Sequence, residues 1–409
     1  MIRVAEMFAG VGGFRLALEG YGKPGDKLYM PPAGDYTTVW ANQWEPPGTE
    51  TKQFAWECYE SRFGEGSCVN EDIEKVLDQY EAGEREIPDF DMLVGGFPCQ
   101  DYSVGKPAPY AKGIEGKKGV LWWSIQRMLG LKRPKYVLLE NVDRLLKSPT
   151  SQRGRDFAIM LSCLAQLGYD AEWMVVNAAD YGMPQRRRRV YIFARLRGTA
   201  ADLGRISEAF PFELSGKACE FDVPKDPYRA SKSFGGHGKS PFLKYGRMSG
   251  CYVWTSDMNP RYDGPIRTLG DVVVPDSDVP GQFFISPDSL ERWEYLKGAK
   301  REPRVARNGH EYIYAEGPVA FPDPLDKPSR TILTSEGGTS PNRSKHVVMG
   351  DSGRLRRLVP DELDQLQMFP RGWTDTGMTD NQRAFCMGNA LVVGIPHRIG
   401  VEIARADRG

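Results

Sequence analysis

The amino-acid sequence predicts an α/β protein built on a doubly wound sheet, with a second, smaller and irregular β-rich part. Short apolar runs indicate buried strands, and stretches of helical periodicity alternate with them. The apolar runs cover residues 3–8, 91–94 and 136–139, and the helical stretches cover residues 15–19, 120–129 and 155–167. From about residue 200 to 326 this alternation is lost, which indicates a domain boundary.

Length and charge set the first limits on function. The chain has 409 residues, enough for a large core and more than one domain. Its 54 basic and 54 acidic side chains cancel, so binding to nucleic acid would need local clustering of charge. Between Lys225 and Arg267, eight basic residues accompany three aspartates, with aromatic residues interleaved. This segment suits a surface that binds phosphates. The alternative is a surface loop region whose charged and aromatic residues bind no ligand.

Cysteine and histidine usage disfavours several classes of site. The seven cysteines are scattered and include no Cys-x-x-Cys pair, which favours reduced thiols over structural zinc. The four histidines are not grouped, so a metal site would find few ligands. The amino terminus has no signal-like segment, and no apolar run approaches membrane-spanning length. We therefore expect a soluble, cytoplasmic protein that binds no metal and no membrane.

A glycine-rich turn follows the first predicted strand. A strand, a glycine turn and a helix in succession open a nucleotide-binding unit, because glycine lets a ligand approach the backbone and the helix offers free N–H groups. The turn and the residue before it are Phe8, Ala9, Gly10, Val11, Gly12 and Gly13. Their spacing is tighter than the dinucleotide fingerprint Gly-x-Gly-x-x-Gly, which disfavours binding of NAD. A plain chain reversal is the alternative.

The second predicted strand, residues 38–45, ends in Gln43, Trp44 and Glu45. A polar side chain at this point normally holds a ribose hydroxyl. Because residues 43 and 45 share one face of an extended chain, either can reach the ribose, and the choice stays open. Trp44 can stack on an adenine ring, and filling the core is the alternative. A third strand is expected to end at residues 70–73.

Two strands are expected to bring reactive side chains to one edge of the sheet. The run 91–94 leads into Gly95-Gly96-Phe97-Pro98-Cys99-Gln100, where the glycines and Pro98 should stop the strand and expose Cys99 at its carboxyl end. A cysteine there can be a nucleophile, although a small buried hydrophobe is the commoner role. The run 136–139 delivers Glu140 to the same edge, where a partly desolvated carboxylate suits a proton donor. A solvated surface acid is the alternative.

Four consecutive arginines precede an apolar strand at residues 190–194. If the strand begins within them, Arg187 and Arg189 face one side and Arg186 and Arg188 the other, so one pair can face the site. For Arg186 and Arg188 we expect a solvated or phosphate-binding face, which is the usual role of an arginine run.

Several motifs occur in an order that resembles the DNA cytosine-5 methyltransferase family of bacterial and archaeal restriction-modification systems. They are the glycine turn, Pro98-Cys99-Gln100, Glu140-Asn141-Val142, Gln185-x-Arg187-x-Arg189 and Gly388-Asn389-Ala390. The resemblance covers residues 1–195 and 329–400. It departs from the family at Gln43, since an acid usually precedes the aromatic residue there.

The resemblance implies a Rossmann-like methyltransferase sheet dependent on S-adenosyl-L-methionine. Residues 1–199 and 327–409 would form the catalytic and cofactor-binding domain, and residues 200–326 the target-recognition domain. Cys99 would attack C6 of a flipped-out cytosine, Glu140 would assist at N3, and Arg187, supported by Arg189, would orient the ring. The base that removes the C5 proton and the DNA target sequence are not identified.

The resemblance also assigns binding residues. Asp72 would contact the adenine amino group, and the stretch after Cys99 would close over DNA as a lid. The expected cofactor-binding residues are Phe8, Gly10, Val11, Gly12, Gly13, Gln43, Trp44, Asp72, Ile73, Pro98, Asn389 and Ala390. The expected DNA-binding residues are Gln100, Ser103, Lys106 and Arg247.

The expected partner is double-stranded DNA, the expected product S-adenosyl-L-homocysteine, and the expected state a monomer associated with the prokaryotic nucleoid. A restriction endonuclease acting on the same site is a further expected partner. The nearest alternative is a tRNA cytosine-5 methyltransferase, whose recognition segment is generally shorter. An NAD-dependent oxidoreductase leaves Cys99, Glu140 and the arginines unexplained, and a non-catalytic DNA-binding module leaves the reactive residues without a role.

Overall fold

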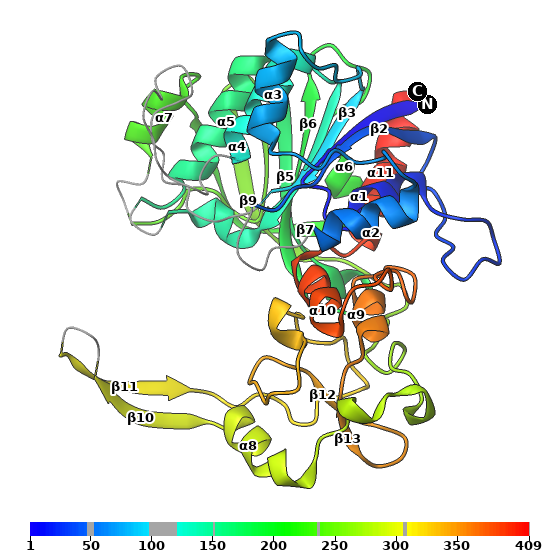
Figure 1. Cartoon of the computed structure of the whole chain (residues 1–409). Helices are drawn as coiled ribbons and strands as arrows, with labels where there is room; N and C mark the ends of the chain where they lie inside the picture. The colour runs from blue at the N-terminus through cyan, green and yellow to red at the C-terminus, as the bar shows by residue number, and fades with distance from the viewer. Residues whose placement is uncertain (47–52, 98–120, 150–151, 235–237, 306–308, 409) are drawn as a thin grey trace. The chain divides into compact units, whose positions relative to one another are not determined.

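The structure, a computed structural model, describes residues 1–46, 53–97, 121–149, 152–234, 238–305 and 309–408 (Figure 1). The chain forms two compact units, which we call unit 1 and unit 2. Unit 1 comprises Met1–Tyr181, Arg188–Gly264 and Leu391–Gly409. Unit 2 comprises Gly182–Arg187 and Pro265–Ala390.

Unit 1 contains a nine-stranded sheet in the order β2-β1-β3-β4-β6-β5-β8-β9-β7. Strands β2, β1, β3 and β4 are parallel, and β6, β5, β8, β9 and β7 continue the sheet in antiparallel pairs. The strands are β1 (Ile2–Met7), β2 (Tyr36–Asn42), β3 (Met92–Gly96), β4 (Tyr136–Val142), β5 (Tyr169–Asn177), β6 (Arg188–Leu196), β7 (Phe212–Asp222), β8 (Tyr245–Ser249) and β9 (Tyr252–Pro260). The mixed α/β fold with a large central sheet is thereby confirmed.

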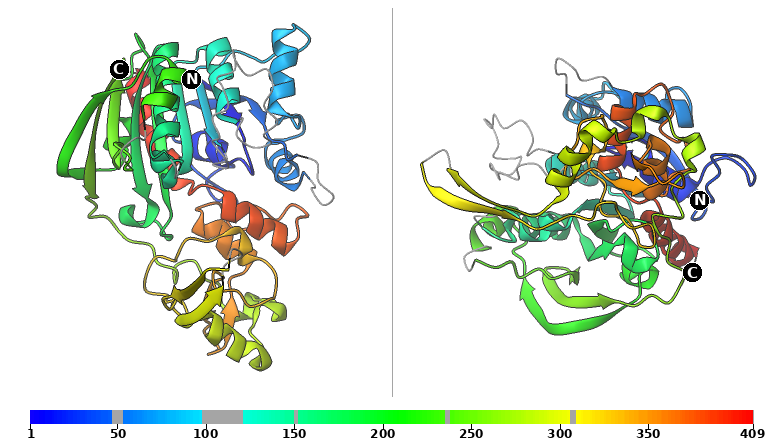
Figure 2. Two further views of the ribbon diagram at one scale, coloured as in Figure 1. Left: turned by 90° about the vertical axis from the view of Figure 1, so that its left-hand side faces the viewer. Right: turned by 90° about the horizontal axis from the view of Figure 1, so that it is seen from below.

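Helices cover both faces of this sheet (Figures 1 and 2). Helices α3, α4 and α5 pack in succession on one face, while α1, α11 and α6 pack together on the other. The helices of unit 1 are α1 (Gly13–Glu19), α2 (Phe54–Phe63), α3 (Ile73–Glu81), α4 (Leu121–Lys132), α5 (Arg155–Leu167), α6 (Arg205–Ala209), α7 (Pro227–Ser233) and α11 (Gly394–Arg408). Two 3₁₀ helices join them, η2 (Asp143–Lys147) and η3 (Ala178–Tyr181). Burial on both faces explains why β3 and the first four residues of β4 carry no charged side chain.

The core of unit 1 is dense around α5, whose predicted range 155–167 is confirmed. Phe157 on this helix meets Trp173 edge-on at a ring distance of 5.1 Å and Phe242 at 4.9 Å. Edge-to-face contacts of this kind stabilise beyond the area they bury. The segment around Phe242 is thereby fixed to the main sheet of unit 1.

Two local expectations were wrong. Residues 70–73 do not end a third strand, because only an isolated bridge joins Val69 to Asn42 and Asp72 instead caps α3. The glycines after residue 94 do not stop β3, which runs through Gly95 and Gly96. A Cβ atom on Gly95 would lie 2.7 Å from the carbonyl oxygen of Met7, so glycine is needed inside the strand for close approach to β1.

Unit 2 is largely irregular and holds two small sheets. Its regular elements are α8 (Pro287–Lys297), β10 (Lys300–Val305), β11 (Glu311–Glu316), β12 (Val347–Met349), β13 (Leu355–Arg357), α9 (Pro360–Leu366) and α10 (Asp380–Asn389). Three short 3₁₀ helices accompany them, η4 (Asp276–Asp278), η5 (Gly281–Phe283) and η6 (Thr334–Glu336). β10 pairs with β11, and β12 with β13, both antiparallel. The assignment of residues 200–326 to target recognition stays a prediction.

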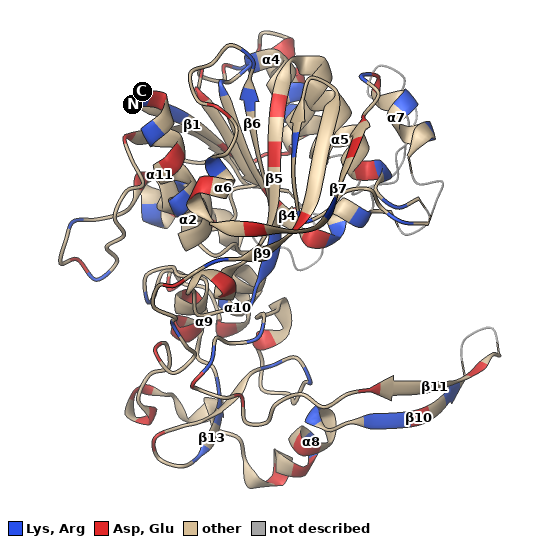
Figure 3. Cartoon of the chain, turned by 180° about the vertical axis from the view of Figure 1, so that it is seen from behind, with Lys and Arg blue, Asp and Glu red and all other residues tan. Residues whose placement is uncertain are grey.

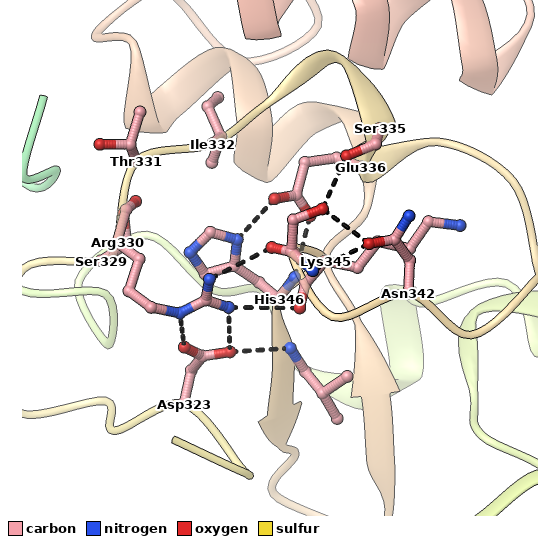
Figure 4. A network of polar contacts seen from close by, with 12 residues as sticks. Asp323, Ser329, Arg330, Thr331, Ile332, Ser335, Glu336, Asn342, Lys345 and His346 are labelled. Carbon is pink, nitrogen blue, oxygen red and sulfur yellow. Dashed lines mark hydrogen bonds and ion pairs between the residues drawn. The ribbon is translucent and has the colours of Figure 1, made fainter. Parts of the chain in front are cut away.

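A buried polar network organises unit 2 (Figure 4). Arg330 binds Asp323 through two contacts of 2.6 and 3.1 Å and also donates to the carbonyl oxygens of Ser344 and Lys345. His346 meets Glu336 at 2.7 Å. Burial opposes ionisation of Asp323, but Arg330, His346 and a backbone N–H together hold its pKa below the usual value. The network therefore ties the segment from Asp323 to Arg330 to the loop that ends at His346.

We predict that Asp323→Asn destabilises the protein by about 3 kcal/mol, because it leaves the Arg330 charge largely buried without its partner. Urea denaturation measures the change. The contribution of a carboxyl group whose pKa is lowered by folding is present at neutral pH and is lost as the pH falls through its folded pKa. The difference between the two proteins should therefore shrink in acid. Asp326→Asn, at an exposed position in the same segment, is the control and should unfold like the wild type.

Candidate active site

The glycine turn after β1 is built from unusual backbone conformations. Phe8, Gly10 and Gly12 all have positive φ, at 57°, 55° and 83°. A Cβ atom on Gly12 would lie 2.4 Å from the Phe63 ring, so only glycine fits. The N–H of Ala9 donates to the carbonyl oxygen of Asn42 at 3.1 Å, which fixes the turn to the end of β2. The turn therefore presents its backbone at the carboxyl edge of the sheet.

Glu6 is buried behind this turn and holds the start of the helix that follows it. It is not among the residues predicted from the sequence. Its carboxylate accepts the N–H of Phe14 at 3.1 Å and the hydroxyl of Tyr59 at 3.2 Å. Burial raises the pKa of Glu6 to about 7, against the opposing effects of these hydrogen bonds and of Arg15. The sequence signal that could have identified Glu6 is an acidic residue within a short, mostly apolar strand. Glu6 is thus a buried carboxyl group that fixes the start of α1.

At the end of β2 the structure shows the partners of Gln43 and Glu45, the two residues expected to reach the ribose. Gln43 is buried, and its Oε1 accepts the N–H of Gly10 at 2.7 Å. This contact fixes the orientation of the amide, so Nε2 points to the Glu45 carboxylate at 3.2 Å. Gln53 holds the Glu45 backbone by two hydrogen bonds, of 3.0 and 2.8 Å. Trp44, between them in sequence, is half-buried.

Asp72 and Ile73 lie at the start of α3. The Asp72 carboxylate accepts the N–H of Glu74 at 3.0 Å, which is an ordinary N-cap. Ile73 is buried in the core. Asn42 Nδ2 donates to the carbonyl oxygens of Val69 and Glu71, so β2 and the start of α3 are linked directly. A contact between Asp72 and an adenine stays a prediction.

Glu140 lies within β4, opposite Gly96 of β3, and its side chain is nearly buried. Arg189 of β6 meets its carboxylate, with Nε 2.8 Å from Oε1. The two residues are diagonal neighbours on one face, because Val142 is the register partner of Arg189. Gly96 lies close to this carboxylate, since a Cβ atom there would lie 3.2 Å from Glu140 Oε2. The arrangement holds an acid in a fixed orientation beside the end of β3.

The chain that leaves β3 is fixed as far as Phe97. Asn141 Nδ2 donates to the carbonyl oxygen of Phe97 at 2.8 Å, and the Phe97 ring lies 6.1 Å from that of Trp122. The predicted residues that follow lie outside the described residues, and they are Pro98, Cys99, Gln100, Ser103 and Lys106. The described part of the chain therefore stops at Phe97 here and resumes at Leu121.

The arginine run divides between the units. β6 begins at Arg188, within the arginine run, and the burial of Arg187 and partial burial of Arg189 alternate with the exposure of Arg186 and Arg188 as expected. Arg187 belongs to unit 2, where it is buried and donates to the carbonyl oxygens of Gly388 at 3.0 Å and Ile332 at 3.3 Å. Arg186 and Arg188 are exposed, as expected of a solvated face. Arg189 is the member of the run that the structure pairs with Glu140.

The remaining predicted residues have local partners. Asn389 ends α10 and is exposed, and the carbonyl oxygen of Ala390 accepts Gln367 Nε2 at 2.9 Å. Arg247 on β8 is partly exposed and donates to the Tyr245 hydroxyl at 2.5 Å and the Ser207 hydroxyl at 3.1 Å. Their roles toward cofactor and DNA stay predictions.

In the part of the chain that the structure describes, no group of three or more His, Cys, Asp or Glu residues could hold a metal ion. Within those same ranges no single helix is long and apolar enough to cross a membrane, and α10 and α11 reach that length only when taken together.

Comparison with known proteins gives the family. Residues 2–405 match the family described as C-5 cytosine-specific DNA methylase. The chain is 43% identical to the Type II methyltransferase M.Sau3AI of Staphylococcus aureus, over 99% of this chain and 96% of that protein. It is 35% identical to M.HhaI of Haemophilus parahaemolyticus, over 47% of this chain and 48% of that protein.

Solved structures agree at the level of the fold. A Spodoptera frugiperda DNMT2 variant aligns over the whole of both chains with a TM-score of 0.60 and 14% identity. A putative DNA modification methyltransferase encoded within an Escherichia coli prophage aligns over the whole of both chains with a TM-score of 0.52 and 14% identity. Because the match to the family runs through nearly the whole sequence, the chain belongs to the C-5 cytosine-specific DNA methylase family and is a DNA cytosine-5 methyltransferase.

Proposed function

We propose that this enzyme transfers a methyl group from S-adenosyl-L-methionine to C5 of a flipped-out cytosine in duplex DNA, through a covalent bond between Cys99 and C6. The observation that supports this most directly is the Glu140–Arg189 pair, which lies at the carboxyl edge of the sheet beside the strand that leads to Cys99. The glycine turn lies at the same edge, after β1. An acid, a nucleophile and a cofactor turn on adjacent strands are what this reaction needs.

The chemistry follows from the weak nucleophilicity of C5. Attack of the Cys99 thiolate on C6 forms a C–S bond and makes C5 electron-rich, so that it can take the methyl group. A base then removes the C5 proton and the C–S bond breaks, which returns the thiolate. Glu140 would stabilise the charge that develops at N3, and Arg189 would keep its carboxylate in place. Flipping the cytosine costs a few kcal/mol, which contacts with the DNA must offset.

The cofactor supplies an electrophilic methyl group on a sulfonium centre. The edge of unit 1 fits such a molecule, because it combines an open glycine backbone, a half-buried tryptophan and a carboxylate. The positive φ of Gly10 and Gly12 lets a ligand approach the turn, and Trp44 offers a ring for an adenine. In this proposal residues 1–199 and 327–409 serve catalysis and cofactor binding, and residues 200–326 serve target recognition. The enzyme would act as a monomer beside a cognate endonuclease.

We assign the ribose to Glu45 rather than to Gln43. The Gln43 oxygen is already used by the Gly10 N–H, so this side chain offers mainly a donor. Ribose hydroxyls are best held by an acceptor at the end of the second strand, and the carboxylate of Glu45 is the acceptor that the structure orients there. Gln43 is then a positioning residue that links the glycine turn to this carboxylate.

Bisulfite sequencing of DNA from cells that express the chain tests the proposal and identifies the target site. We expect one cytosine within a short sequence to be protected throughout the genome. Labelled cofactor offered with duplex DNA or with tRNA separates the two substrates in vitro. Methylation of tRNA alone would contradict the proposal.

We predict that Cys99→Ser reduces methyl transfer to background while duplex binding is retained, because the thiolate acts in the chemical step. A methyl-transfer assay and a gel-shift assay measure the two properties. Cys219→Ser, at an exposed cysteine on β7, is the matched control and should be fully active. Persistent activity in Cys99→Ser would disprove the covalent mechanism.

Glu140→Gln should slow methyl transfer at neutral pH by roughly 10²- to 10⁴-fold, which is the usual contribution of a positioned acid or base. Binding of S-adenosyl-L-homocysteine should not change. Asp143→Asn, three residues further along the chain, is the control for removal of a carboxylate near this edge. Equal rates for wild type and Glu140→Gln in single-turnover experiments would remove Glu140 from the chemical step.

Glu45→Gln should weaken binding of S-adenosyl-L-homocysteine about tenfold or more in isothermal titration, because the ribose hydroxyls no longer meet a charged acceptor. A 2′-deoxy or 3′-deoxy analogue should show a much smaller difference between wild type and variant. Glu57→Gln, at an exposed acid on α2, is the control. If Gln43→Ala weakens binding and Glu45→Gln does not, Gln43 itself holds the ribose.

A further inference from the structure

We infer that unit 1 carries a sequence-independent DNA-binding surface beside the end of β4, which grips backbone phosphates flanking the target cytosine. This inference rests on the proposed function. The surface, which we call the basic shoulder, consists of Arg144, Lys147, Arg153, Arg229, Lys232 and Lys239. Arg229, Lys232 and Lys239 lie in the basic segment 225–267 that the sequence predicts to bind phosphates, whereas Arg144, Lys147 and Arg153 lie outside it.

The first part of the basic shoulder is adjacent to the active edge along the chain. β4 ends at Val142, two residues after Glu140, and η2 follows at once. Arg144 and Lys147 lie on η2 and are exposed, and Arg153 lies just before α5 and is half-buried. Because a strand and its exit share one edge of the sheet, these cations lie on the side where Glu140 emerges.

The second part comes from the segment between β7 and β8 and is held firmly to the first. Gln152 Nε2 donates to the carbonyl oxygens of Ser231 at 2.9 Å and Phe234 at 2.5 Å. The Ser240 hydroxyl donates to the carbonyl oxygen of Leu146. A Cβ atom on Gly154, whose φ is 88°, would lie 2.8 Å from Ser240 Oγ, so the two segments are in close contact. α7 also packs against α5.

The charge of the basic shoulder is not neutralised by the described residues. None of its six side chains forms an ion pair with any described residue. The neighbouring acids have other partners, because Asp143 lies 4.0 Å from Arg188 and Asp156 lies 2.9 Å from Arg155. Asp226 caps α7. Figure 3 shows Lys and Arg on α7 and beside it.

These features point to phosphates rather than to bases as the ligand. The chain as a whole is neutral, so a local group of cations without ion-pair partners among the described residues would attract a polyanion, although Lys232 also lies 5.4 Å from the Tyr228 ring centre. Exposed lysines on flexible stems neutralise phosphates without reading sequence. Their place at the edge that carries Glu140 favours the duplex that enters the site over an unrelated acidic partner. We therefore expect these cations to strengthen binding and to leave target choice unchanged.

The test is the salt dependence of duplex binding, measured by fluorescence anisotropy with and without the target site. The triple variant Lys147→Gln, Lys232→Gln, Lys239→Gln should bind both duplexes about tenfold or more weakly at low salt. Its slope of log affinity against log salt should fall by about 0.9 for each phosphate that the variant no longer neutralises. The control triple variant Lys23→Gln, Lys27→Gln, Lys217→Gln removes three exposed lysines elsewhere on unit 1 and should bind like the wild type.

Further variants and measurements separate this inference from its alternatives. Replacing the same three lysines by arginine should restore affinity and slope, which a folding defect would not allow. The glutamine variant should keep its affinity for S-adenosyl-L-homocysteine and its kcat at saturating DNA, with a raised KM for DNA. An unchanged salt slope in the glutamine variant would overturn the inference. Failure of the wild type to methylate any DNA would instead overturn the proposed function.

Discussion

The parallel register of β1 to β4 is the constraint on which the candidate site depends. Met7 is the register partner of both Asn42 and Gly95, and Gly95 is the partner of Leu139. Each strand therefore reaches the same line before its chain turns out of the sheet. Because a slip of one residue would move every side chain to the opposite face, the register decides which residues emerge together. It places the glycine turn, Gln43 and Glu140 at one edge.

Two glycines of β3 are part of this constraint. Gly95 allows the backbone of β3 to lie close to Met7, and Gly96 leaves room for the Glu140 carboxylate. A side chain at Gly96 would approach Glu140 Oε2, and the carboxylate would have to shift relative to Arg189. The glycines that look in sequence like a strand terminator thus serve packing inside the strand. They also set the point from which the chain continues toward Cys99.

Apolar and periodic runs in the sequence predicted many strands and helices of unit 1. Contacts between residues far apart in the sequence determined the remaining elements. β1, β4 and α5 were predictable because each is a compact apolar or periodic run. The strand expected to end at residues 70–73 does not form, since Asn70, Glu71 and Asp72 are polar and the helix cap of Asp72 outweighs strand pairing. The antiparallel half of the sheet could not be foreseen, because the pairing of β8 with β5 joins residues about seventy positions apart. Contacts at such separation leave no periodic trace in the sequence.

For the candidate site, the sequence predicted which residues matter but not which residues they contact. The sequence identified Glu140 by its place at the end of a strand, and Arg189 by strand alternation and by its match to the Gln-x-Arg-x-Arg motif. It could not show that they are diagonal neighbours, because that depends on where β6 begins. Arg187 falls one residue before that start, and its guanidinium binds backbone carbonyl oxygens of unit 2. Arg187, just before β6, therefore binds backbone carbonyl oxygens, whereas Arg189, inside β6, binds the carboxylate of Glu140.

Gln43 shows why a departure from a family pattern can be compensated locally. An acid at this position would also accept the backbone N–H of Gly10, but only the amide can in addition donate to Glu45. The negative charge then lies two residues further along the same extended face. Gln53 and Asn70 fix the backbone of this stretch, through the main chain of Glu45 and the carbonyl oxygen of Gln43. In the proposed assignment of the ribose to Glu45, the acceptor has moved by two residues and its backbone stays fixed.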